Sequence, residues 1–218
     1  MIARRIISFI TVILICLSLA SCNDDREYDE AEVLSAARDL IERSLPINEI
    51  LYGAGFEASD EGVGVYKKAK AESLAAYGYS TLTQLQDDIR EIYSSSYADS
   101  ILSSDVFSAI KVDDVIVGYT RYYQATDDDG NHTDIMVKSD YDYPLRNEYS
   151  FHEQMEVIGV DGEVITVRTL VTAKREDGHI KNVNLDIKLI EEESGWRLMT
   201  PTYVVYNEYT EIYDNLKK

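Results

Sequence analysis

Beyond residue 22 the sequence contains no cysteine, because both of its cysteines, Cys16 and Cys22, lie near the N-terminus. The rest of the chain therefore has no thiol for a disulfide, a thiolate zinc site or a cysteine nucleophile. The three histidines, His132, His152 and His179, are far apart, and no two of them have the i, i+4 spacing of metal ligands on one helix. A glycine-rich phosphate loop and a G-x-S-x-G turn are also missing. We therefore expect no catalytic centre, no cofactor and no metal site.

Long apolar runs are missing as well, except for one at the N-terminus. Residues 6–19 are apolar apart from two serines and a threonine, and they follow Arg4 and Arg5. This run is too short for a comfortable membrane span and has the features of a targeting segment. The residues that follow it, Leu19-Ala20-Ser21-Cys22, resemble the lipobox of bacterial lipoproteins.

The lipobox resemblance implies a location at the cell envelope. It implies that residues 1–21 are a signal peptide that is removed and that the thiol of Cys22 receives the lipid. Two acyl chains give stable anchoring, so the protein is expected to sit outside the cytoplasm, bound to a membrane through Cys22. The alternative is a plain secretory signal with an incidental cysteine. Residues 22–30 are then a charged tether, and residues 31–218 are expected to form a single domain.

Positive charge is scarce. The chain has 21 lysines and arginines against 40 aspartates and glutamates, a formal charge of −19. Removal of residues 1–21 takes away two arginines and no acid, which leaves −21. Such a surface is repelled by phosphate backbones, so we expect no nucleic-acid partner. A partner should be neutral or basic, although the charge also has a simple explanation in solubility.

The first half of the chain has helical patterns. Asp29 and Glu32 resemble a capping box before a helix, Pro46 is expected to interrupt that helix, and a further turn or two should end at Gly53. Residues 53–78 contain five glycines and predict a long excursion with a helical piece near 67–76. Further on, the sequence predicts a capping box at Thr81 and Gln84, an amphipathic helix from Leu82 to Ile92, and a short helix capped by Ser96 and running through Leu102.

After about residue 112 the apolar spacing changes to that of strands. Hairpin turns are indicated at "DDDGN", at Asp161-Gly162 and at "EESG". Between 182 and 189 apolar and polar residues alternate, which is typical of a strand with one buried and one wet face. Helices followed by an antiparallel meander predict an α+β fold with N-terminal helices packed on one face of a curved sheet.

This order of elements resembles the NTF2-like and cystatin-like superfamily. The resemblance covers residues 80–206 and depends on the paired hairpins and on Gly195-Trp196-Arg197-Leu198. It implies a cone formed by the sheet. More narrowly, "LPINEILYGAGF", "YGYSTLTQLQDDIREIYSSSYADSI" and "GWRLMTPTY" are similar to relatives of the IseA-type inhibitors of cell-wall DL-endopeptidases. That likeness implies a non-enzymatic binding module whose partner is a cell-envelope protein such as a peptidoglycan hydrolase.

The sequence offers three other candidate sites. Residues 127–134 resemble a calcium loop, but alignment on Gly130 places Ala125 and Met136 at ligand positions that need oxygen, so the match fails. In the NTF2-like family a general base lies inside the cone opposite a tyrosine, which would cast Tyr119, Tyr123, His152 and Asp186 in an enzyme's site. A small-molecule or glycan binder would use the same concave face.

Tyrosine is the abundant aromatic residue, with 17 copies against four phenylalanines and one tryptophan. Its ring gives a large rigid contact area with a polar tip, which suits wet interfaces and sugar rings. The alternative use is half-buried packing in the sheet. The predicted recognition surface is an exposed cluster around "YTRYY" and "SDYDYP", made by Tyr119, Arg121, Tyr123, Tyr141 and Tyr143.

Overall fold

The structure is a computed structural model that describes residues 28–108, 110–112, 115–127, 129 and 131–206. The predicted signal peptide, Cys22 and most of the predicted tether therefore lie outside the described residues. The helices and strands, in chain order, are α2 (Glu30–Tyr52), β1 (Ala58–Val63), β2 (Tyr66–Ala69), α3 (Ala71–Tyr77), α4 (Leu82–Ile92), α5 (Ser95–Leu102), β3 (Ile110–Val112), β4 (Val115–Gly118), β5 (Tyr122–Thr126), β6 (His132–Lys138), β7 (Glu148–Asp161), β8 (Val164–Lys174), β9 (Ile180–Glu192) and β10 (Gly195–Leu198).

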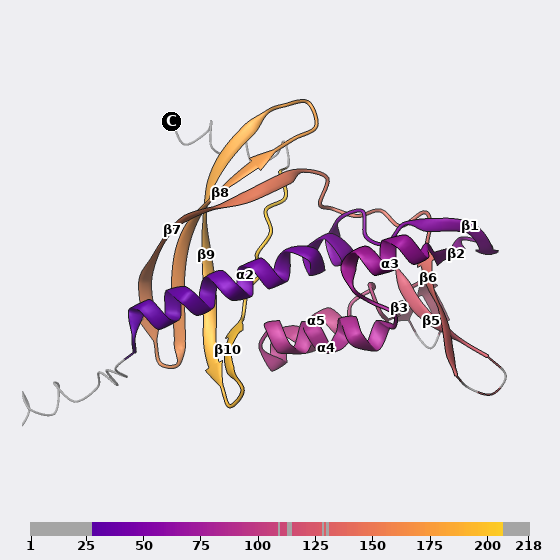
Figure 1. The fold of residues 1–218 in the computed structure, drawn as a ribbon, viewed down its shortest axis with the longest axis horizontal. Helices are drawn as coiled ribbons and strands as arrows, with labels where there is room; N and C mark the ends of the chain where they lie inside the picture. Colours follow the sequence, from indigo (N-terminus) through magenta and orange to yellow (C-terminus); the bar gives the residue numbers. More distant parts are fainter. Residues whose placement is uncertain (1–27, 109, 113–114, 128, 130, 207–218) are drawn as a thin grey trace, which may run out of the picture.

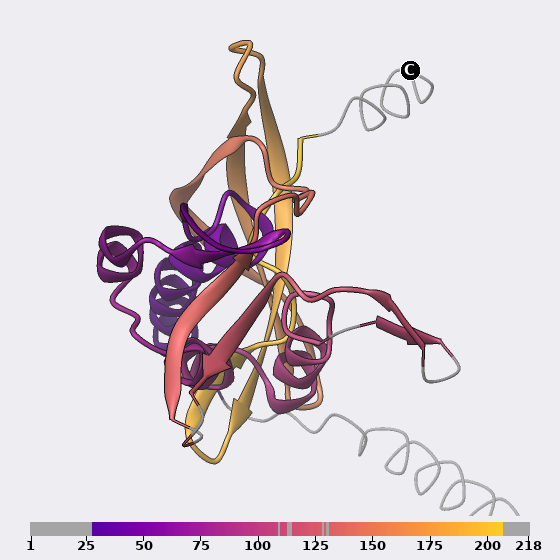
Figure 2. The same cartoon turned by 90° about the vertical axis from the view of Figure 1, so that its right-hand side faces the viewer.

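The predicted α+β class, with helices packed against an antiparallel sheet, is confirmed. The strands do not form one meander, however. A first sheet has the order β1-β2-β6-β5 and a second the order β10-β9-β8-β7. Within the part of the chain that the structure describes, β3 and β4 pair only with each other, and they project from the body as an arm (Figure 2).

The first sheet contains a hairpin where the sequence predicted an excursion. Strands β1 and β2 turn around Gly64, whose φ of 60° lies in the left-handed region open to glycine. Strand β2 then pairs with the distant β6, with Tyr66 opposite Lys138. Because of this long-range pairing, residues 66–69 form a strand. The helical piece that the sequence predicted near 67–76 is therefore limited to α3.

Helix α2 is continuous through Pro46, so the predicted interruption is wrong. Asp29 caps the helix by accepting hydrogen bonds from two amides of the first turn. A proline inside a helix costs about 3 kcal/mol through its lost amide and its steric clash. Ile41 before the proline and Ile47 and Ile50 after it are all buried in the same core. Burial on both sides of Pro46 offsets the local penalty.

The predicted helix 82–92 and the predicted short helix that runs through Leu102 are confirmed as α4 and α5. Thr81 and Gln84 form the expected capping box. Helix α5 starts two residues earlier than expected, with Ser94 rather than Ser96 at the cap position. Ser94 is held by its amide, which donates to the carbonyl of Leu198 at the end of β10.

The second sheet has the predicted hairpins and the predicted alternation. Along β9, Ile187 and Leu189 are buried while Asp186 and Lys188 are exposed. Figure 1 shows α2 lying across this sheet, and residues of α2, β8, β9 and β10 belong to one core cluster. The inner face is thus filled by side chains. The strand after the "EESG" turn, β10, is short: its pairing with β9 ends at Leu198, and residues 199–206 have no strand structure.

No helix in the described part of the chain is both long and apolar enough to cross a membrane.

Candidate functional site

Two of the five residues predicted as a recognition surface are exposed: Tyr119 in the segment just before β5, and Tyr123 on strand β5 of the first sheet. Their exposed fractions are 60% and 37%. The ring of Tyr66 packs edge-on against both, with centroid distances of 6.4 Å to Tyr119 and 4.8 Å to Tyr123. The Tyr66 hydroxyl donates to the carbonyl of Thr120 at 2.6 Å. This contact fixes the segment that connects β4 and β5.

Arg121 does not belong to that surface, because only 2% of it is exposed. Strand β4 ends at Gly118, and Arg121 lies in the connection to β5, where its side chain reaches the C-terminal end of α2. Nη1 donates to the carbonyl of Leu51 at 3.0 Å, and Nη2 donates to the carbonyls of Gly53 and Ala54 at 2.7 and 2.9 Å. Carbonyls at a helix end lack partners in the helix and carry partial negative charge, so they attract a guanidinium.

Tyr141 and Tyr143 are held by the buried Arg121 instead of projecting freely. The guanidinium carbon lies 4.7 Å from the ring centroid of Tyr141 and 5.7 Å from that of Tyr143. The Tyr141 hydroxyl also donates to Asp105 at 3.3 Å. Burial raises the pKa of Tyr141. The predicted surface therefore divides into an exposed pair on one side and two rings packed on Arg121 on the other.

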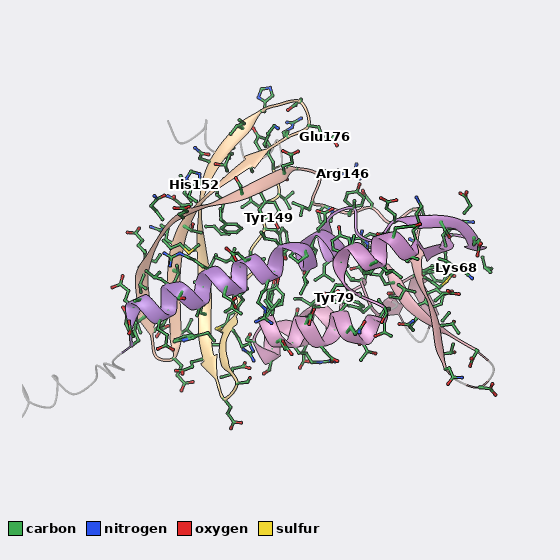
Figure 3. All side chains as sticks on the ribbon, in the orientation of Figure 1. Lys68, Tyr79, Arg146, Tyr149, His152 and Glu176 are labelled. Atoms are coloured by element: carbon green, nitrogen blue, oxygen red, sulfur yellow. The ribbon has the colours of Figure 1, made fainter. Side chains whose placement is uncertain are left out.

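Tyr143 lines a groove with a volume of about 1020 Å³. The groove lies at the C-terminal end of α2, between the 143–149 segment and the turn that joins β8 to β9. Arg146, Tyr149 and Glu176 are at this end of the molecule in Figure 3. Its size is at the upper end of the range for ligand sites.

The groove has aromatic and charged walls. The rings are those of Tyr143, Tyr149 and Tyr206. The basic side chains are Arg146, Lys174 and Arg175, and the acidic ones are Glu49, Glu148, Glu176 and Asp177. With three basic and four acidic groups, the lining is close to neutral in a chain whose formal charge is −19.

Each basic side chain of the groove has an acidic neighbour. Lys174 pairs with Glu148 at 3.3 Å and Arg175 with Asp177 at 3.0 Å, while Arg146 pairs with Asp142. Both arginines also stack on rings: the guanidinium carbon of Arg146 lies 5.2 Å from the Tyr143 centroid, and that of Arg175 lies 5.5 Å from the Tyr206 centroid. Stacking orients a guanidinium and leaves its N–H edge able to donate.

The walls of the groove are held by buried polar contacts. The Tyr149 hydroxyl accepts from Asn48 of α2 at 3.3 Å, and burial raises the pKa of Tyr149 to about 12. Asn147 ties in the C-terminal segment, since its amide nitrogen donates to the carbonyl of Val204 at 2.9 Å and its oxygen accepts from the amide of Tyr206 at 2.7 Å. The groove is therefore a preformed feature of the fold.

The four residues cast as an enzyme's site are not brought together. Tyr123 belongs to the first sheet and Tyr119 lies just before its strand β5, whereas His152 and Asp186 belong to the second sheet. His152 Nε2 lies 2.9 Å from Thr172 Oγ1. The carboxylate of Asp186 is on the exposed outer face, 2.6 and 2.7 Å from two guanidinium nitrogens of its cross-strand neighbour, and these hydrogen bonds lower its pKa. These four side chains therefore do not form one site inside a cone.

Most of the groove was missed by the sequence analysis. Of the predicted recognition residues, Tyr143 alone is part of its lining. Arg146 follows the segment "SDYDYP", and Arg175 directly precedes "EDGH". In both places the available signal was a basic residue next to acidic ones.

Comparison with known proteins returned no matching family model, no matching curated protein and no matching solved structure. The resemblances to lipoproteins, to the NTF2-like and cystatin-like superfamily and to IseA-type inhibitors therefore stay predictions.

Proposed function

We propose that this protein is a lipid-anchored, extracytoplasmic binding module that is not an enzyme and that holds a segment of a cell-envelope protein, such as a peptidoglycan hydrolase, in the groove at the end of α2. The observation that carries the proposal is the groove itself. It has a volume of about 1020 Å³, three tyrosine rings and buried supporting contacts.

The position of the groove suits a tethered protein. Cys22 is seven residues before Asp29, which caps the N-terminal end of α2, whereas the groove is at the C-terminal end. The 23 residues of α2 span about 34 Å at 1.5 Å per residue. A lipid on Cys22 would hold the first end near the membrane, within a reach of roughly 25 Å for the tether. The groove would then be presented away from the membrane, where an envelope partner can enter it.

The side chains of the groove favour binding over catalysis. The carboxylates of Glu148 and Asp177 are engaged by Lys174 and Arg175, and one carboxylate oxygen of Glu49 accepts from the amide of Ala54 at 2.8 Å. Tyrosine rings supply rigid contact area with little loss of conformational entropy. Such a lining recognises a ligand by shape, stacking and hydrogen bonds.

A second candidate, a small-molecule or glycan binder, is favoured by the three tyrosine rings, because rings stack on the apolar faces of sugars. Its site would be this groove and not the inner face of the second sheet, since α2 covers that face.

The protein proposal is tested by a pull-down from envelope extract and by an assay of peptidoglycan hydrolase activity. The wild-type chain should recover a hydrolase and lower its activity. Arg146→Glu, at the groove, should weaken both effects. Arg90→Glu is the matched control, because Arg90 is also an exposed arginine paired with a nearby aspartate and lies on α4, away from the groove. Recovery of no hydrolase, together with unchanged hydrolase activity, would contradict the proposal.

A further inference from the structure

We infer that the ligand of the groove is a peptide chain that carries both an ammonium and a carboxylate group. This inference rests on the proposed binding function and narrows it to a ligand class. It follows from which charges of the groove are already paired, which are not, and how the arginines are held.

The groove has two carboxylates that could accept an ammonium. Among the described residues, ion pairs are formed by Arg146, Lys174 and Arg175, but none is formed by Glu49 or Glu176. Glu49 lies at the end of α2 and Glu176 in the turn between β8 and β9, so the two carboxylates come from different walls. An ammonium entering the groove can gain a charge-assisted acceptor at either carboxylate.

The groove also has two arginines that could receive a carboxylate. Arg146 pairs with Asp142, four residues before it, whose side chain is 87% exposed, and Arg175 pairs with Asp177, two residues after it, whose side chain is 45% exposed. Exposed ion pairs of this kind contribute little, so a carboxylate of the ligand can displace them at low cost. Stacking on Tyr143 and Tyr206 keeps both guanidinium groups oriented during that exchange.

The overall charge excludes a simple polyanion or polycation as the best ligand. The lining is nearly neutral, and the chain as a whole has a formal charge of −19, so a polyanion is repelled at long range. A polycation would leave the arginines facing like charge. A peptide that carries both an ammonium and a carboxylate can pair with the acidic and with the basic side chains of the groove. Side chains of a protein segment and the termini of a short free peptide provide the same groups.

Isothermal titration calorimetry on the full chain tests this with a panel of short peptides. The probes are Ala-Lys-Ala-Glu-Ala with free termini, the same peptide with an acetyl and an amide end, and a blocked Ala-Gln-Ala-Gln-Ala of equal length. Chitotetraose serves as a neutral glycan. The free and the blocked forms of Ala-Lys-Ala-Glu-Ala should both bind at least about tenfold more tightly than the blocked glutamine peptide. The reason is that charge-assisted hydrogen bonds are stronger than those between neutral groups. Added salt should weaken them. A preference for free termini indicates a short peptide as the natural ligand, and equal binding of both charged probes indicates a protein segment.

Substitutions in the groove test its basic and its acidic side chains separately. Arg146→Gln and Arg175→Gln should each weaken the charged peptides about tenfold, and Glu176→Gln should weaken them similarly, whereas Arg90→Gln should bind like the wild type. Equal binding of charged and uncharged peptides would overturn the inference. So would the absence of peptide binding, or tighter binding of chitotetraose that is unaffected by the arginine variants. If a hydrolase is still recovered in the pull-down under those outcomes, the proposed function stands and only the ligand class is wrong.

Discussion

Replacing Arg121 by methionine should destabilise the protein strongly, because this buried guanidinium fastens the first sheet to the end of α2. Methionine retains much of the apolar stem and removes three hydrogen bonds to backbone carbonyls and the stacking on three tyrosine rings. A hydrogen bond to a charged group contributes about 1.5–3 kcal/mol, so the three together are worth roughly 5–9 kcal/mol before offsets.

Two terms reduce that figure. The variant no longer has to bury a charge, which is costly without a counter-ion. In addition, Nε of Arg121 is buried and has no acceptor among the described residues, so its removal relieves an unsatisfied donor. We therefore expect a net loss of about 3–5 kcal/mol in the free energy of unfolding, within the range for breaking a buried charged contact. Many domains have only about 5–15 kcal/mol in total.

Urea unfolding followed by circular dichroism measures this loss by linear extrapolation. Arg90→Met is the matched control, since Arg90 is 54% exposed and pairs with Asp87 on the same helix. Pairs of that kind contribute about 0.3–0.5 kcal/mol. If Arg121→Met lowers the free energy of unfolding by less than about 1 kcal/mol, as the control does, Arg121 does not hold the first sheet to the end of α2.

Three further predictions concern the same framework. Gly55→Ala should destabilise the fold by more than the roughly 1–2 kcal/mol that a left-handed backbone costs, because its φ is 71° and a methyl group there would also collide with Arg121 and Tyr122. Gly64→Ala is the control, since its φ is 60° but the space around it is open. Equal decreases in melting temperature for the two variants would contradict the predicted collision. Thr202→Val should cost about 1–3 kcal/mol by calorimetry, because the buried Thr202 hydroxyl bonds the side chains of Ser44 and Asn48, and an unchanged melting temperature would argue against that network. Burial raises the pKa of Tyr122 from 10.0 to about 12, so the unfolded chain loses this proton first and stability should fall as pH rises through that interval; urea midpoints that do not change between about pH 9 and about pH 11 would contradict it.

Local features were predicted well because their signals are contiguous. The capping box of α4, the alternation along β9 and the turn at Gly162 each depend on residues within a few positions of one another. Such patterns reflect backbone hydrogen bonding and side-chain period directly. The α+β class follows from their order.

Features that depend on distant pairing were not predictable. The division into two sheets depends on the pairing of β2 with β6, which joins Tyr66 to Lys138 across 72 positions. The continuity of α2 through Pro46 depends on a core completed by later strands. In both cases tertiary contacts outweigh a local preference.

The candidate site was found only in part for the same reason. A period-two reading of "YTRYY" places Tyr119, Arg121 and Tyr123 on one face, but the chain leaves strand geometry between β4 and β5, and Arg121 turns inward. The groove combines the end of α2, the segment before β7 and the turn after β8. No short window of sequence contains all of these parts.

The central claim, that the groove at the end of α2 is the binding site, is tested most directly by nuclear magnetic resonance titration of the full chain with blocked Ala-Lys-Ala-Glu-Ala. The account expects amide shifts that saturate at Arg146, Tyr149 and Glu176, with those of Tyr119 and Tyr123 unchanged. Shifts confined to Tyr119 and Tyr123, or no saturable shift at the groove, would contradict it.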